Sequence, residues 1–145
     1  VEKMKPSAVI VSQFVYADSS QSDLRNALLT LQSISPNILL IENKPIFPDE
    51  KDFMVGRPLV MLPYQPPKSF SLSEMQIKDQ NASNQLADWA RENTISTMNF
   101  DSLFCTKENC ARYGGSNWLY WDDDHFSVAG AALTIPQLVS FLQRF

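Results

Sequence analysis

The stretches Ala8-Val-Ile-Val-Ser-Gln-Phe14 and Ile38-Leu-Leu-Ile41 decide the fold class of this chain. Each is a short, nearly continuous apolar run, as expected of a strand that is buried on both faces of a sheet. Between them, Ser20 to Asp23 has the form of a helix start, and apolar residues then recur at helical spacing as far as Pro36. Strand, helix and strand with short joints predict a βαβ unit, and therefore an α/β fold with a parallel sheet flanked by helices.

The middle of the chain is less regular. Residues 43–70 hold six prolines and predict a long excursion from the sheet, with a short extended piece at 59–62. Long loops of this kind often border a ligand site in α/β domains. Ser71 and Glu74 then predict the capping box of a second helix that ends near Arg91, and residues 95–99 predict a third strand.

The last 28 residues predict a short aromatic strand at 118–121 and a terminal helix after it. Ser127 is placed to cap this helix. Its inner face is predicted from the helical spacing of its apolar residues, which are Val128, Ala131, Ala132, Ile135, Leu138, Val139 and Leu142. Pro136 interrupts the hydrogen-bond ladder, so we expect a kink or two abutting helices.

Length and composition narrow the class of protein. The chain has 145 residues, 44% hydrophobic and 19% charged, which suits one compact domain covering residues 1–145. Twelve basic against sixteen acidic residues, without a basic cluster, argue against a nucleic-acid partner. No apolar run approaches ~18 residues, so this segment is expected to be soluble and not to span a membrane. The opening Val1-Glu-Lys-Met-Lys-Pro6 resembles no signal peptide, and we expect the chain to begin in the middle of a domain.

The two cysteines, Cys105 and Cys110, bear on compartment. A metal site would require more thiolates or a histidine pair, so no metal is expected here. A small disulfide loop is the favoured interpretation, and it would place the domain outside the reducing cytosol. Two free, buried thiols are the alternative.

Ionisable residues converge at one place, Asp122-Asp-Asp-His125. A carboxylate three residues before a histidine, in a loop that precedes a helix, can turn back and accept the Nδ1 hydrogen of the imidazole. That contact fixes the tautomer and leaves Nε2 available as a general base. Asp123 and Asp124 could favour the protonated imidazole by proximity, but they are expected to lack the spacing to orient the ring, so Asp122 is the predicted orienting residue of His125. Three alternatives compete: a solvated acidic turn, a surface ion pair and a Ca²⁺ loop. The last lacks the alternating ligands and the glycine of an EF-hand.

The residues around this block resemble a known family. Tyr120-Trp-Asp-Asp-Asp-His-Phe-Ser-Val-Ala-Gly-Ala131 is similar to the closing block of the SGNH hydrolases, in which an Asp-x-x-His pair ends the catalytic set. The run Asp-Asp-Asp-His, an apolar residue, Ser-x-x-Gly-Ala resembles the SGNH domain attached to acyltransferase-3 membrane proteins. The segment Asp101-Ser-Leu-Phe-Cys105 with Cys110 and the Gly114-Gly115 turn also resembles that group, which has a cysteine pair upstream of the histidine.

The resemblance implies a three-layer SGNH or flavodoxin-like fold, with His125 as the general base and Asp122 as its orienting acid. In the family this pair activates a serine in a Gly-Asp-Ser block at the end of the first strand, and an oxyanion hole stabilises the tetrahedral intermediate. No Gly-Asp-Ser occurs in these 145 residues. The resemblance therefore implies the C-terminal portion of such a domain, without its first strand and helix, and a chain that alone has almost no activity.

Two substitutes for the missing groups can be named. The family's third block offers an asparagine to the oxyanion, and this chain has Ser12 and Gln13 in that place as weak candidates. Asp18-Ser19 follows a strand and could be a relocated nucleophile, although it lacks the glycine. The alternative to an enzyme is a non-catalytic ligand-binding or interaction domain that keeps the fold.

The resemblance further implies a setting for the whole protein. It implies O-acyl transfer or ester hydrolysis on acyl esters, mostly linked to carbohydrate, on the extracytoplasmic or lumenal face of a membrane. It also implies a membrane acyltransferase domain in the parent protein, and no metal or organic cofactor.

Overall fold

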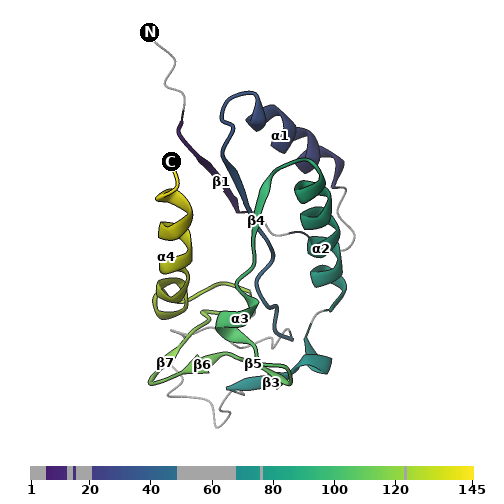
Figure 1. The fold of residues 1–145 in the computed structure, drawn as a ribbon. Helices are drawn as coiled ribbons and strands as arrows, with labels where there is room; N and C mark the ends of the chain where they lie inside the picture. The colour runs from purple at the N-terminus through teal and green to yellow at the C-terminus, as the bar shows by residue number, and fades with distance from the viewer. Residues whose placement is uncertain (1–5, 13–14, 16–20, 49–67, 76, 123) are drawn as a thin grey trace. The chain divides into compact units, whose positions relative to one another are not determined.

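The computed structural model describes all residues except 1–5, 13–14, 16–20, 49–67, 76 and 123 (Figure 1). The chain forms two compact units. Unit 1 comprises residues 1–43, 78–99 and 141–145, and unit 2 comprises residues 44–77 and 100–140.

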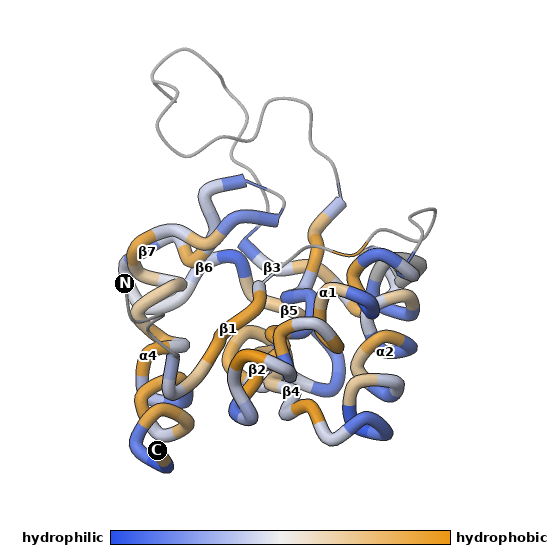
Figure 2. Tube along the Cα trace, turned by 90° about the horizontal axis from the view of Figure 1, so that it is seen from above, coloured by the Kyte–Doolittle hydropathy of each residue, from blue (hydrophilic) through white to orange (hydrophobic). Residues whose placement is uncertain are grey.

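Unit 1 is built on a parallel sheet of three strands, in the order β1-β2-β4. The strands are β1 (Val9–Ser12), β2 (Ile38–Ile41) and β4 (Ser96–Met98). The register pairs Val9 with Ile38 and Leu39 with Ser96. The predicted parallel α/β arrangement is confirmed, and β2, the middle strand of the three, has Ile38, Leu39 and Leu40 buried. Both β1 and β2 are coloured as hydrophobic in Figure 2.

Two helices, α1 (Ser22–Gln32) and α2 (Ile77–Glu92), cover one face of this sheet. Alternate residues of the strands point to them, so that Ile38 and Leu40 share a core with Leu28 of α1 and Leu86 of α2. The predicted helical spacing of 24–31 is present, although the helix begins at Ser22 with Gln21 before it. Ser20, the predicted cap, lies outside the described residues.

Unit 2 holds small antiparallel pairs, of which the sequence indicated only a strand at 118–121; the strand observed there is Asn117–Trp118, and Tyr120 forms an isolated bridge. β3 (Ser69–Ser71) pairs with β5 (Asn109–Ala111), and β6 (Tyr113–Gly114) pairs with β7 (Asn117–Trp118). A 3₁₀ turn, η2 (Leu72–Glu74), carries the predicted capping box of Ser71 and Glu74, so the box precedes α2 instead of opening it. The extended piece predicted at 59–62 lies outside the described residues.

A disulfide joins Cys105 to Cys110, as the favoured interpretation of the cysteine spacing predicts. It closes the loop between the short helix α3 (Asp101–Phe104) and β5. The same segment is held by backbone hydrogen bonds, including Thr106 N–H to Asn109 O at 2.8 Å. The disulfide therefore pins α3 to the edge of the β3–β5 pair.

The last helix, α4 (Val128–Leu142), is continuous through Pro136, so two abutting helices, one of the two expected outcomes, are not formed. Its predicted inner face is wrong. Val128 is 90% exposed and Ile135 is 54% exposed, whereas Gly130, Thr134 and Phe141 are buried. The helix contains no charged residue, so the spacing of its apolar residues does not identify one side as the core side.

Candidate active site

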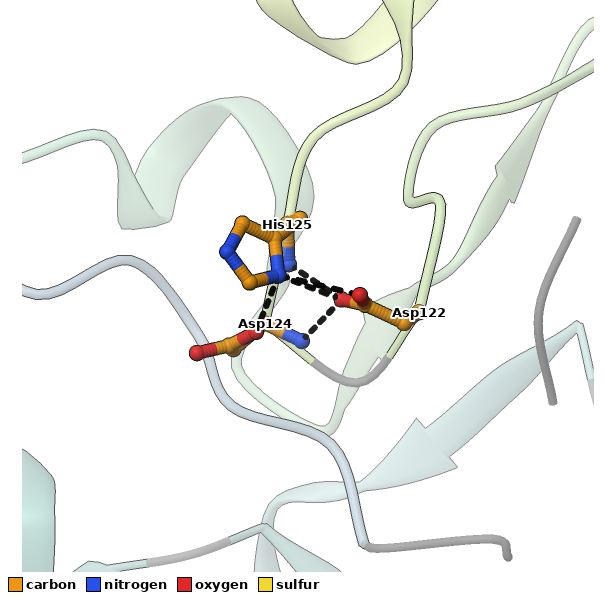
Figure 3. A group of neighbouring side chains, drawn as sticks. All are labelled: Asp122, Asp124 and His125. Atoms are coloured by element: carbon orange, nitrogen blue, oxygen red, sulfur yellow. Dashed lines mark hydrogen bonds and ion pairs between the residues drawn. The ribbon is translucent and has the colours of Figure 1, made fainter. Parts of the chain in front are cut away.

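The loop that carries the Asp-His block is closed at its base by backbone contacts. Tyr120 and Phe126 form an isolated antiparallel bridge, and the N–H of Trp121 donates to the carbonyl of His125 at 2.6 Å. These contacts bring the two ends of the segment 121–125 together in a tight turn. The turn is therefore a defined structural element that presents Asp122, Asp124 and His125 (Figure 3).

Ser127 connects this turn to α4. Its hydroxyl donates to the carbonyl of Trp118 at 2.5 Å and accepts the N–H of Gly130 at 3.1 Å. The second contact satisfies a free N–H in the first turn of the helix, which is the predicted cap. The start of α4 at Val128 is thereby fixed three residues after the histidine.

His125 faces Asp122 with its Nδ1 atom. That nitrogen lies 2.9 Å from Oδ2 and 3.0 Å from Oδ1 of Asp122. Oδ1 also accepts the backbone N–H of His125 at 2.7 Å and that of Asp124 at 3.1 Å. Asp122 thus shapes the turn and contacts the ring at the same time, and the spacing of three residues has this geometric basis.

A second carboxylate also contacts the ring, so the prediction that Asp124 lacks the spacing to reach it is wrong. Asp124 Oδ1 lies 2.7 Å from Nδ1 of His125. Both aspartate side chains are largely sheltered, at 20% and 19% exposure, whereas the imidazole is 71% exposed. The ring is therefore held from its protected side, and no residue that the structure describes hydrogen-bonds to Nε2.

The environment of Asp122 favours its ionised form. Burial raises the pKa of its carboxyl, but the hydrogen bonds from the backbone of His125 and Asp124 and from the imidazole together lower the pKa below its ordinary value. A carboxylate that stays ionised is suited to hold an Nδ1–H and to stabilise an imidazolium opposite it.

Aromatic side chains pack against one another at Tyr120 and Phe126, the two residues that flank the turn. Tyr120 is fully buried, and its ring centroid lies 5.0 Å from that of Phe126 and 4.7 Å from that of Phe47. Arg112 is also fully buried, with its guanidinium 4.8 Å from the ring centroid of Phe47. These close contacts restrict the positions that the backbone at residues 120 and 126 can adopt.

Burial and nearby charged residues affect the pKa of the Tyr120 phenol. Burial raises its pKa well above the ordinary value, Asp101 raises it further, Arg112 lowers it, and Asp124 raises it. The phenol of Tyr120 is therefore neutral, and the charge of Asp124 contributes to its raised pKa. Neither Tyr120 nor Arg112 was singled out in the sequence, because one aromatic and one cationic residue carry no periodic signal.

The two candidates for the oxyanion belong to a different unit. Ser12 is the last residue of β1 and its side chain is exposed, whereas Gln13 lies outside the described residues. Asp18 and Ser19 also lie outside the described residues.

Asn43 links the segments that follow β1 and β2. Its side-chain amide accepts the N–H of Val15 at 3.0 Å and donates to the carbonyl of Val15 at 2.8 Å.

Asp122, Asp124 and His125 could each offer one atom to a metal ion, and these atoms lie within 4.8 Å of one another. The distances from Nδ1 to the two carboxylates are 2.7 to 3.0 Å, however, which are hydrogen-bond distances. The contacts within the cluster are the hydrogen bonds to Asp122 and the ion pair with Asp124.

Fold and turn together define a class: a parallel α/β domain that presents a carboxylate-held histidine immediately before its terminal helix. The family model described as "SGNH domain (fused to AT3 domains)" matches residues 2–140, and the chain belongs to this family. No curated protein sequence matches the chain. No helix among the described segments is long and apolar enough to cross a bilayer.

A solved structure shares the fold. The structure of the periplasmic domain of a lipopolysaccharide acetyltransferase from Salmonella ser. Paratyphi A superposes with a TM-score of 0.67 at 13% sequence identity. The match covers 95% of this chain and 57% of that one. The expected SGNH-like α/β fold is therefore confirmed, and the chain spans little more than half of that neighbour.

Proposed function

We propose that residues 1–145 act as one partial SGNH-type domain, the C-terminal part of a protein that transfers or hydrolyses O-acyl groups. His125 is the general base and Asp122 its orienting acid. The nucleophilic serine comes from residues that precede this segment in the parent protein. The observation that carries the proposal is the 2.9 Å contact between Nδ1 of His125 and Asp122, in a histidine whose side chain is 71% exposed.

The chemistry follows from that arrangement. Asp122 accepts the Nδ1 hydrogen, so the lone pair of the neutral imidazole lies on Nε2. Nε2 takes the proton of a serine hydroxyl as its oxygen attacks the ester carbonyl, and the imidazolium that forms is stabilised by the carboxylate. Collapse of the tetrahedral intermediate breaks the bond to the leaving alcohol, which receives the proton from Nε2. A sugar hydroxyl or water then accepts the acyl group by the same steps in reverse.

The substrate and setting are part of the same proposal. Membership of a family described as fused to AT3 domains supports a membrane acyltransferase domain as partner in the parent protein. The solved neighbour is a periplasmic domain of a lipopolysaccharide acetyltransferase, which supports carbohydrate-linked acyl esters as substrates. The Cys105–Cys110 disulfide supports an extracytoplasmic or lumenal location. No metal or organic cofactor is required by these steps.

The test compares this chain with the full-length parent in p-nitrophenyl acetate hydrolysis. The chain alone is expected to show no turnover above buffer. The parent is expected to be active and to lose at least about 10³-fold in kcat/KM with His125→Ala, because the general base is removed. The matched control is Gln85→Ala, an exposed residue of α2, which should leave activity unchanged.

Two results would overturn the proposal. Turnover by the chain alone that is lost with His125→Ala would show that the nucleophile lies within residues 1–145. A parent protein that is inactive, or equally active with and without His125, would favour a ligand-binding or interaction domain that keeps the fold.

A further inference from the structure

We infer that Asp124 is a second positioning residue for His125, which shares the Nδ1 hydrogen with Asp122. This inference rests on the proposed role of His125 as general base, and it adds a residue to which the family pattern Asp-x-x-His assigns no role. It concerns how the ring is held, so it is tested without turnover.

The geometry places both carboxylates at one nitrogen. Asp124 Oδ1 is 2.7 Å from Nδ1, and the nearer oxygen of Asp122 is 2.9 Å from it. A neutral imidazole has a single hydrogen to offer at Nδ1, and a carboxylate can only accept. Both carboxylates lie at hydrogen-bond distance, and each favours the tautomer that carries its hydrogen on Nδ1.

The two aspartates are anchored differently. Asp122 uses Oδ1 to accept two backbone N–H groups, which ties the carboxylate to the turn. The charge of Asp124 also contributes to the raised pKa of the buried phenol of Tyr120. The ring nitrogen therefore contacts two carboxylates, and that of Asp122 is also bonded to the backbone of the turn (Figure 3).

Different anchoring gives different consequences for substitution. In Asp122→Asn, the amide oxygen can keep the two backbone hydrogen bonds, which leaves the amide N–H₂ toward the ring. An N–H donor at Nδ1 favours the opposite tautomer, with the hydrogen on Nε2. If Asp124 holds the ring as inferred, its carboxylate opposes this change and the Nδ1–H form persists.

The chain contains a single histidine, so its imidazole nitrogens are observed directly in long-range ¹H–¹⁵N NMR spectra. The spectra are recorded on this chain at a pH high enough to keep the imidazole neutral. We expect the Nδ1–H form to dominate in the native chain and in Asp124→Ala. It should remain detectable in Asp122→Asn, and it should be replaced by the Nε2–H form in Asp122→Asn/Asp124→Ala.

Glu108→Gln in the Asp122→Asn background is the matched control, because Glu108 is an exposed carboxylate of the same unit. It should give the same spectrum as Asp122→Asn. Backbone amide spectra show that each variant is folded. The inference is overturned if Asp122→Asn alone gives the spectrum of the double variant, or if the double variant keeps the Nδ1–H form.

Failure here is distinguishable from failure of the proposed function. The tautomer is read in the absence of substrate and nucleophile, whereas the proposed function is decided by turnover of the parent. A parent that depends on His125 with no contribution from Asp124 would refute only this inference.

Discussion

Gly130 of α4 lies directly against the backbone of Leu119, so that a Cβ atom at position 130 would overlap the carbonyl oxygen of Leu119. That carbonyl also accepts the N–H of Ser127 at 3.0 Å. The helix thus approaches the segment before the histidine turn as closely as a backbone can. This contact gives a physical reason for the glycine five residues after His125.

Gly130→Ala should therefore be costly. The added methyl group meets backbone and not the end of a flexible side chain, so α4 or the 119–121 segment must shift. We expect a loss of at least about 2 kcal/mol in the free energy of unfolding, measured by urea denaturation. Ala132→Ser, on an exposed position of the same helix, should stay within about 0.5 kcal/mol. A Gly130→Ala protein as stable as the native chain would show that the close approach is absent.

In contrast to Gly130→Ala, removal of the Tyr120 hydroxyl is expected not to destabilise the fold. It is buried and has no hydrogen-bond partner among the described residues, so its desolvation is uncompensated. Tyr120→Phe keeps the ring contacts and removes that group. The free energy of unfolding should be unchanged or higher by up to about 1 kcal/mol. Tyr113→Phe, at a half-buried position, is the matched control. A loss above about 1 kcal/mol in Tyr120→Phe alone would mean that the hydroxyl makes a hydrogen bond in solution.

Asp122 should contribute to acid sensitivity. Its pKa in the folded chain is lowered from the ordinary value of 3.8, because hydrogen bonds from the backbone and the imidazole outweigh the opposing effect of burial. A carboxyl with a depressed folded pKa stabilises the fold above the unfolded value, and this stability is lost as the pH falls through the folded value. The advantage of the native chain over Asp122→Asn should thus be constant above about pH 5 and decrease below pH 3.8.

Urea denaturation of both proteins at about pH 6 and about pH 3, followed by tryptophan fluorescence, measures this difference. An advantage of the same size at both values, or one that grows in acid, would contradict the hydrogen bonding described for Asp122.

Sequence reasoning succeeded where a pattern had one physical cause. The run at 38–41 is apolar throughout because β2 is the central strand of the described sheet, and the structure places the strand at Ile38–Ile41. Asp-x-x-His predicted a contact because a turn of that length returns the first carboxylate to the ring. The cysteine spacing predicted a loop that a disulfide can close, and the bond is present.

Sequence reasoning failed where several causes produce the same pattern. In α4 the apolar spacing indicated a helix correctly, but the buried residues are Gly130, Thr134 and Phe141, and none of these has an aliphatic side chain. The strands of unit 2 have two or three residues, which is too short for any period to appear. Asp124 was wrongly set aside on its spacing, because its contact with His125 depends on the path of the turn and not on its distance along the chain.

The most direct measurement of the central claim is to label the full-length parent with a fluorophosphonate, which reacts with an activated serine, and to map the labelled peptide by mass spectrometry. The account predicts one labelled serine on the N-terminal side of Val1, no label on the chain alone, and labelling at least about 10³-fold slower in His125→Ala. Label on a serine within residues 1–145, or labelling that does not depend on His125, would contradict it.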